Sequence, residues 1–309
     1  MTAFEPLRKM ARCSALAAAA LAFAGCDAAN EAIDAIDDVG SDADVFYYVS
    51  LGTSLSVGVR PNSSGVLLTS SDGYPDQLFD MIRSDFEAAG PNRELRLVKL
   101  GCPGETLDDL INGGSCPYVA GSQLDAAVDF LGDNAEKVFL LTIDIGANDF
   151  RNADCITDAV DLDCVSEVSG QIATDLASVL ATLSGAADPF TTIVGMNYYN
   201  PYLSSWLDGP DGQTLATDSA QAAVVFNDLL TSTYGTAGVT MADVYGAFES
   251  DDFVTMVSSP DGMVPVNVAN ICEFTYMCDA PPVGPDIHAT VAGYSLIADT
   301  LMGALPAAP

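Results

Sequence analysis

Five short apolar runs alternate with longer stretches of helical periodicity from residue 45 to the end of this chain. Continuous runs rich in β-branched residues, separated by helices, are typical of parallel strands that are buried on both faces. No linker or repeat divides this region, so the sequence predicts one doubly wound α/β domain over residues 45–309. The expected strands are 45–51, 95–100, 138–145, 191–196 and 239–244, and the expected helices are 74–88, 121–132, 165–184, 218–234 and 290–302.

Chemistry-bearing residues follow several of these strands. Ser54 comes after the first expected strand, Gly104 after the second and Asn148 after the third, and His288 precedes the last helix. Ligands of open parallel sheets bind outside the carboxyl ends of the strands. We therefore expect these four residues to meet at one rim of the sheet.

Their chemistry is that of acyl transfer. A serine hydroxyl needs a base to take its proton, and His288 is the single histidine of the chain. Asp286 stands two residues before it and can orient the imidazole. The backbone N–H groups of Ser54 and Gly104 and the side-chain amide of Asn148 can hold the developing oxyanion. Each residue taken singly also fits an ordinary turn or a helix start.

Charge excludes one class of partner, and the acidic residues form no metal-binding motif. Ten Lys and Arg residues stand against 43 Asp and Glu, for a formal net charge of −33. This leaves no basic surface for nucleic acid. No Asp/Asn-rich calcium loop and no CxxC zinc motif is present. We therefore expect neither a calcium nor a zinc site.

The N-terminus is typical of export. Residues 1–25 combine a positive patch with an apolar run that is too short for a spanning helix, which needs about 20 residues. The run ends at Cys26, which resembles the acylated first residue of a bacterial lipoprotein. Cleavage after Ala24, leaving Cys26 unmodified, is the alternative. Residues 26–44 are small and acidic and are predicted to form a tether. A lipid anchor at Cys26 would be the protein's contact with a membrane.

The remaining cysteines also fit an exported protein. Of eight cysteines, Cys13 lies in the signal and Cys26 is the lipidation candidate, which leaves six. Disulfides persist outside the cytosol. The most economical of the possible pairings joins neighbours along the chain. It predicts the pairs Cys102–Cys116, Cys155–Cys164 and Cys272–Cys278.

Four motifs together resemble the GDSL, or SGNH, hydrolases. They are GTSLS at 52–56, GCPGET at 101–106, GAND at 146–149 and DIH at 286–288, in the family's order. The resemblance spans most of the domain and is closest to the exported esterase and lipase branch. It implies a three-layer α/β/α sandwich with a flavodoxin-like five-stranded parallel sheet, and hydrolysis of carboxylic esters without a metal or organic cofactor. It also implies Ser54 as nucleophile, His288 as base, and Ser54, Gly104 and Asn148 as the oxyanion hole.

Two residues depart from the family pattern. Thr53 stands where Asp usually precedes the serine, which predicts altered hydrogen bonding beside the nucleophile. Pro285 occupies the usual place of the triad acid. Asp286 is the substitute that we expect, and a backbone carbonyl that orients His288 is the alternative.

The sequence thus predicts an exported, monomeric esterase or lipase that acts on a small-molecule or lipid ester. A catalytically decayed cell-surface module that binds glycan or lipid is an alternative from another class, and a polysaccharide O-acetyl esterase is a third. Residues 245–285 lack periodicity, which indicates a functional loop or lid, and their apolar side chains fit an acyl-binding wall or a cover for the core. Asn197, Tyr198 and Tyr199 are candidates for the pocket lining.

Overall fold

The computed structural model of the protein describes residues 44–306. The expected signal peptide, Cys26 and residues 27–43 of the expected tether lie outside the described residues. The first strand begins at Asp44, one residue before the start of the expected strand 45–51. The Asp44 N–H donates to the carbonyl of Asn92, with 2.6 Å between nitrogen and oxygen, and Asp44 pairs with Arg93 of the neighbouring strand.

The five predicted strands form one parallel sheet. Its order is β4-β1-β5-β6-β7, which places the first strand inside the sheet rather than at its edge. Tyr48 of β1 and Thr142 of β5 join their hydroxyls at 2.9 Å in the interior. The strands are β1 Asp44–Gly52, β4 Arg93–Lys99, β5 Val138–Asp144, β6 Thr192–Met196 and β7 Thr240–Ala242.

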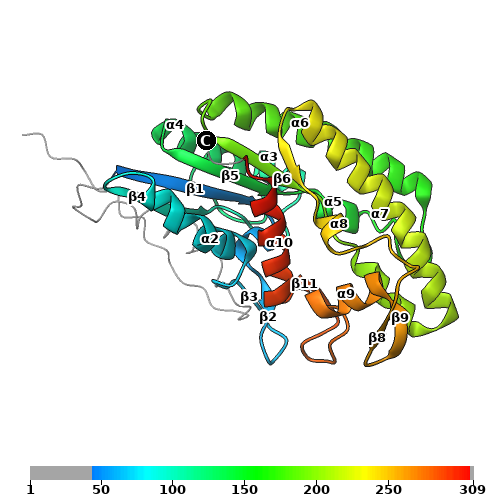
Figure 1. Ribbon diagram of the computed structural model, residues 1–309. Coiled ribbons are helices and arrows are strands. Elements are labelled where there is room, and N and C mark those ends of the chain that lie inside the picture. The colour runs from blue at the N-terminus through cyan, green and yellow to red at the C-terminus, as the bar shows by residue number, and fades with distance from the viewer. Residues whose placement is uncertain (1–43, 307–309) are drawn as a thin grey trace, which may run out of the picture.

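Helices cover both faces of this sheet, so the three-layer α/β/α sandwich is confirmed. Helices α2 (Tyr74–Ala88) and α10 (Val291–Ala304) pack together on one face (Figure 1). Helices α4 (Gln123–Asp133), α6 (Leu162–Ala186) and α7 (Pro210–Thr236) cover the other. All five long helices were predicted, although α7 begins eight residues before its expected start at residue 218.

Several helices begin where a side chain accepts from an otherwise unpaired N–H group. Asp161 accepts from two backbone N–H groups at the start of α6, and Ser122 and Thr290 each accept one at the starts of α4 and α10. Helix α7 lacks such a side-chain cap and begins instead with Pro210 at its first position.

Short elements follow the carboxyl ends of the strands. They are η2 Leu55–Val57, β2 Arg60–Pro61, β3 Leu67–Leu68, α3 Leu107–Asn112, α5 Ala147–Asn152, η3 Pro201–Asp208, α8 Val244–Ala247, β8 Met256–Ser259, β9 Gly262–Pro265, α9 Val266–Phe274, β10 Thr275–Tyr276 and β11 Asp286–Ala289. The segment 245–285, expected as a loop, therefore consists largely of short helices and hairpin strands.

The three predicted disulfides are present: Cys102–Cys116, Cys155–Cys164 and Cys272–Cys278. Over residues 44–306 no helix is long and apolar enough to cross a membrane. The same residues contain no group of three or more His, Cys, Asp or Glu side chains arranged to hold a metal ion.

Candidate active site

A cavity of about 260 Å³ opens beyond the carboxyl ends of β1, β5 and β6. Ser54, Asn148 and His288 all line it, although they come from three distant parts of the chain. Ser54 follows β1, Asn148 lies in α5 after β5, and His288 lies in β11. The fold thus brings three of the predicted site residues to one pocket.

The turn that carries Ser54 depends on Gly52. Its φ is +125°, and an added Cβ would lie 2.1 Å from the carbonyl oxygen of Asp144, so another residue would clash there. The buried Gln123 side chain holds the same residue from the other side. It accepts from the Gly52 N–H at 2.6 Å and donates to the Gly52 carbonyl at 3.0 Å. Ser54 is the N-cap residue of η2, and its hydroxyl makes no capping hydrogen bond. Its Oγ is therefore free to face the cavity.

Thr53 is held by a carboxylate at the end of the central strand. Its hydroxyl donates to Asp144 Oδ2 at 2.6 Å, and its backbone N–H donates to the same oxygen at 3.2 Å. The Tyr74 hydroxyl donates to the other oxygen at 2.9 Å. Asp144 is fully buried, and burial raises its pKa to about 7 against the lowering effect of these donors. Thr53, which stands where the family pattern has Asp, is therefore hydrogen-bonded to Asp144.

Asn148 is fixed by the loop after β4. One of its amide hydrogens is donated to the carbonyl of Glu105 at 2.9 Å, and its side chain is only 8% exposed. An asparagine amide has two N–H donors, so the second stays available towards the cavity. The neighbouring Asp149 accepts from the Leu107 N–H at 3.0 Å. Burial raises the pKa of Asp149 to about 6. Residues 105–107 and α5 are thus tied together by two hydrogen bonds.

His288 is paired with Asp286. The distance from His288 Nδ1 to Asp286 Oδ1 is 2.7 Å, and the backbone N–H of His288 donates to the same oxygen at 2.9 Å. Burial raises the pKa of Asp286, but hydrogen bonds from the side chain and backbone of His288 outweigh it and leave the pKa below its ordinary value. Tyr199 donates to the carbonyl of Ile287 at 2.7 Å and so holds β11 against the pocket.

Gly104 is placed differently from the other three. It is exposed, has φ +82° and does not belong to the residues that line the cavity. Nothing lies within 4 Å of the position that a Cβ would take there. The structure thus brings Ser54, Asn148, His288 and Asp286 together and leaves Gly104 on the open loop between β4 and α3.

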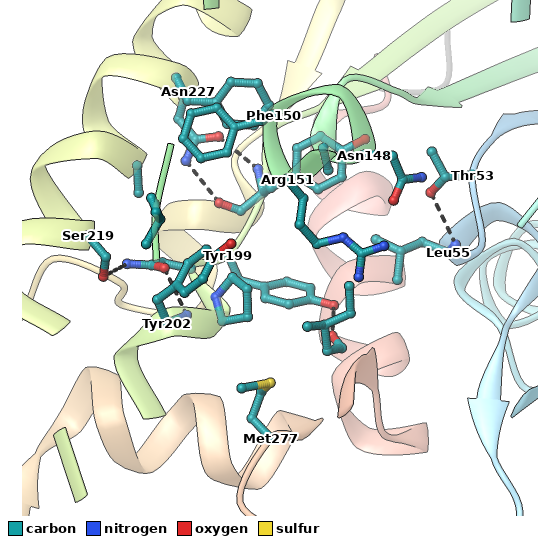
Figure 2. Close-up of a pocket in the computed structure, with 18 of the residues that line it drawn as sticks. Thr53, Leu55, Asn148, Phe150, Arg151, Tyr199, Tyr202, Ser219, Asn227 and Met277 are labelled. Atoms are coloured by element: carbon teal, nitrogen blue, oxygen red, sulfur yellow. Dashed lines mark hydrogen bonds between the residues drawn. The ribbon is translucent and has the colours of Figure 1, made fainter. Parts of the chain in front are cut away.

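The cavity walls are mainly aromatic and apolar. Figure 2 shows Phe150 and Tyr199 among the labelled residues around the space, and Met277 closes it from the segment before β11. Of the three candidates after β6, Tyr198 and Tyr199 line the cavity. Asn197 does not, and its side chain instead bonds Asp243 and the N–H of Tyr245.

Three residues of this site were not singled out from the sequence: Asp144, Gln123 and Arg151. One feature of the sequence could have indicated Asp144, because it is an acid inside the apolar run LLTIDI. No feature indicates Gln123, because its role depends on Gly52, which lies 71 residues away. Arg151 follows GANDF directly and is exposed while lining the cavity.

Comparison with solved structures finds a similar fold in three enzymes. The protein is similar to phospholipase A1 from Streptomyces albidoflavus NA297, with a TM-score of 0.56 and 18% identity, covering 85% of this chain and 100% of that one. It is similar to the extracellular lipase from Streptomyces rimosus, with a TM-score of 0.55, 20% identity, and coverage of 84% and 100%.

A third similar structure is the lipase Lip_vut3 from a goat rumen metagenome, with a TM-score of 0.51, 15% identity, and coverage of 84% and 97%. No protein-family model and no curated protein matches the chain. The protein therefore shares its α/β fold, with the five-stranded parallel sheet covered by helices on both faces, with these three enzymes.

Proposed function

We propose that this protein is an exported serine hydrolase that cleaves carboxylic acyl esters through an acyl-enzyme on Ser54. The observation that carries the proposal is the convergence of Ser54, the His288–Asp286 pair and Asn148 on one apolar cavity. The fold shared with lipases supports a hydrolase, and a largely aromatic wall favours an acyl chain over a polar substituent.

In the first half of the reaction, Ser54 Oγ attacks the ester carbonyl while His288 Nε2 takes its proton. Asp286 holds Nδ1 and stabilises the imidazolium that forms. The second amide hydrogen of Asn148 and the backbone N–H of Ser54 receive the oxyanion, since both residues line the cavity and Gly104 does not. The tetrahedral intermediate collapses, and the alcohol leaves with the proton from His288.

In the second half, water attacks the acyl group and His288 accepts the water proton. Collapse of the second intermediate returns that proton to Ser54 Oγ and frees the carboxylic acid. The Ser54 hydroxyl is the nucleophile in this chemistry, and His288 carries the proton in both halves. The reaction asks for no cofactor.

Export and anchoring are part of the proposal. The apolar N-terminal run and the three disulfides support secretion, and Cys26 is the proposed lipidation site. Intact-mass analysis of the membrane fraction tests the anchor. A mature chain that begins elsewhere than at Cys26, or carries no lipid there, overturns it.

The test of function is hydrolysis of a p-nitrophenyl ester series, acetate to palmitate, by the mature domain and its Ser54→Ala variant. We expect turnover by the parent and a loss of at least about 10³-fold in the variant, with unchanged circular dichroism. Full activity in Ser54→Ala would show that Ser54 is not the nucleophile. A folded parent that is inactive on every ester favours the binding module, and activity confined to acetate favours the O-acetyl esterase.

A further inference from the structure

Arg151 is a cation that, among residues 44–306, forms no ion pair within 4 Å and lies over no aromatic ring, in a chain that has few cations. Of the ten Lys and Arg residues, three precede residue 44. Six of the remaining seven form an ion pair or lie over an aromatic ring: Arg60 with Asp72, Arg96 with Glu94, Lys99 with Asp76, Lys137 with Asp44, Arg83 over Phe79, and Arg93 over Phe46 and Phe86. Within residues 44–306, Arg151 is the one that does neither.

Its position is at the catalytic pocket. Arg151 lies in the last turn of α5 and lines the same cavity as Ser54 and His288. It follows Asn148 by three residues, which places both side chains on the same face of the helix. Figure 2 shows the Arg151 side chain extending across the pocket in the direction of Leu55, the residue after the nucleophile. The guanidinium thus faces the space in which an ester would react.

The nearby Asp286 interacts with Arg151 only at longer range, where the Arg151 charge helps to lower the pKa of that carboxyl. Asp286 gives its Oδ1 to both the side chain and the backbone of His288, and no ion pair within 4 Å joins it to Arg151 in the part of the chain that the structure describes. With 43 acidic residues in the sequence, a stabilising ion pair for Arg151 would have been easy to supply. A guanidinium has a planar fork of donors that fits phosphate and carboxylate oxygens.

We propose that Arg151 is an anion subsite, and that the preferred substrates are acyl esters that carry a phosphate or carboxylate group a few atoms from the scissile carbonyl. This inference rests on the proposed esterase function. The rest of the molecule repels anions, since its net charge is −33. A single unpaired cation beside the nucleophile therefore discriminates in favour of anionic esters that place their charge at that point.

The experiment compares three butyryl esters by titration of the released acid at pH 8. They are 1-butyrylglycerol as the neutral ester, 1-butyrylglycerol 3-phosphate as the phosphate ester and butyryloxyacetate as the carboxylate ester. The readout is the ratio of kcat/KM for each anionic ester to that for the neutral ester. In Arg151→Gln we expect at least one of the two ratios to fall by about tenfold or more, and in Arg151→Lys by less.

The ester whose ratio falls identifies the anion. Arg83→Gln on α2 removes the same charge outside the cavity and serves as the matched control, with both ratios unchanged. Rising NaCl should lower the affected ratio in the parent and leave it unchanged in Arg151→Gln. Equal ratios in the parent and Arg151→Gln for both anionic esters overturn the subsite while leaving the esterase intact.

A binding measurement separates this inference from the proposed function. Calorimetric titration of Ser54→Ala with 1-butyrylglycerol 3-phosphate and with butyryloxyacetate reports affinity without turnover. The double variant Ser54→Ala/Arg151→Gln should bind the affected ester about tenfold more weakly. If the parent hydrolyses no ester, the esterase proposal fails, and this difference in affinity still decides the subsite. Equal affinities in the two variants overturn it.

Discussion

The hydroxyl of Thr53 donates to the carboxylate of Asp144 at 2.6 Å, which ties the residue before the candidate nucleophile to the end of the central strand β5. The two residues are 91 positions apart in the sequence. Asp144 is buried and also accepts from Tyr74. The position of Ser54 thus depends on a buried acid, and pH should affect that acid.

The first prediction concerns stability against pH. The pKa of Asp144 rises from 3.8 to about 7 on folding because of burial. Between these values the folded protein binds a proton that the unfolded chain does not, so the free energy of unfolding falls as pH rises from about 4 to about 7. Asp144→Asn removes this ionisation. Relative to the parent, the variant should gain stability on going from pH 5 to pH 8, by a few kcal/mol.

Urea unfolding at the two pH values measures this shift. Asp299→Asn on the exposed face of α10 is the matched control, and its stability difference from the parent should be nearly the same at both. The prediction is wrong if Asp144→Asn and Asp299→Asn show equal pH dependence.

The second prediction is that Thr53→Asp, which introduces the acid of the GDSL pattern, lowers the stability of this protein. The Thr53→Asp side chain would face the Asp144 carboxylate in a site where Thr53 is 3% exposed. Two buried carboxylates cannot both ionise without strong repulsion, so stability at pH 8 should fall by roughly 2 kcal/mol or more. The pair Thr53→Asp/Asp144→Asn should recover most of this loss, because a neutral amide can donate to the new acid. Urea unfolding of the single and double variants gives the coupling. If the stability changes of the two single variants simply add in the double variant, the prediction is wrong.

The scaffold was predictable because its signal is local. Strands buried on both faces read as continuous apolar runs, so β1 and β5 were found nearly to the residue. The first eight residues of α7 (PDGQTLAT) were missed because Gly, Asp and Thr there carry no apolar period. Elements of four to nine residues between 245 and 285 are too short to show a period of their own.

The site was predictable only where motifs mark it. Ser54, Asn148 and His288 belong to short sequence motifs, and all three line one cavity in the structure. Gln123 and Asp144 act on Gly52 and Thr53 across long sequence separations, and a single sequence does not show such pairs. Arg151 stands out only after the ion pairs and ring contacts of the other Lys and Arg residues between 44 and 306 are known.

The third prediction concerns the acid beside His288. In Asp286→Asn the backbone N–H of His288, which donates to Oδ1 at 2.9 Å, should keep the amide oxygen turned towards Nδ1. The imidazole then keeps its orientation and loses only the charge that stabilises the imidazolium. We expect kcat to fall by up to about 10⁴-fold, and at least as far in Asp286→Ala, which also loses the orienting oxygen. Ester hydrolysis at pH 8 measures both. Full activity in Asp286→Ala would restore the alternative in which a backbone carbonyl orients His288.

The last prediction concerns Tyr199, a positioning residue that acts through β11. Its hydroxyl donates to the carbonyl of Ile287 at 2.7 Å, and its ring stacks on Phe248 with 4.6 Å between centroids. Tyr199→Phe keeps the stacking and leaves that carbonyl without its donor, at a cost of about 1 kcal/mol in unfolding free energy. Because Ile287 precedes His288, kcat should fall several-fold while KM changes little.

Tyr202→Phe is the matched control for this change. Tyr202 lines the same cavity, and among residues 44–306 no hydrogen bond joins its hydroxyl to β11. It should therefore alter KM more than kcat, since it changes the wall of the pocket and leaves the base in place. If both variants lower kcat equally, Tyr199 acts as a wall of the pocket like Tyr202, and the hydrogen bond to Ile287 does not set the position of His288.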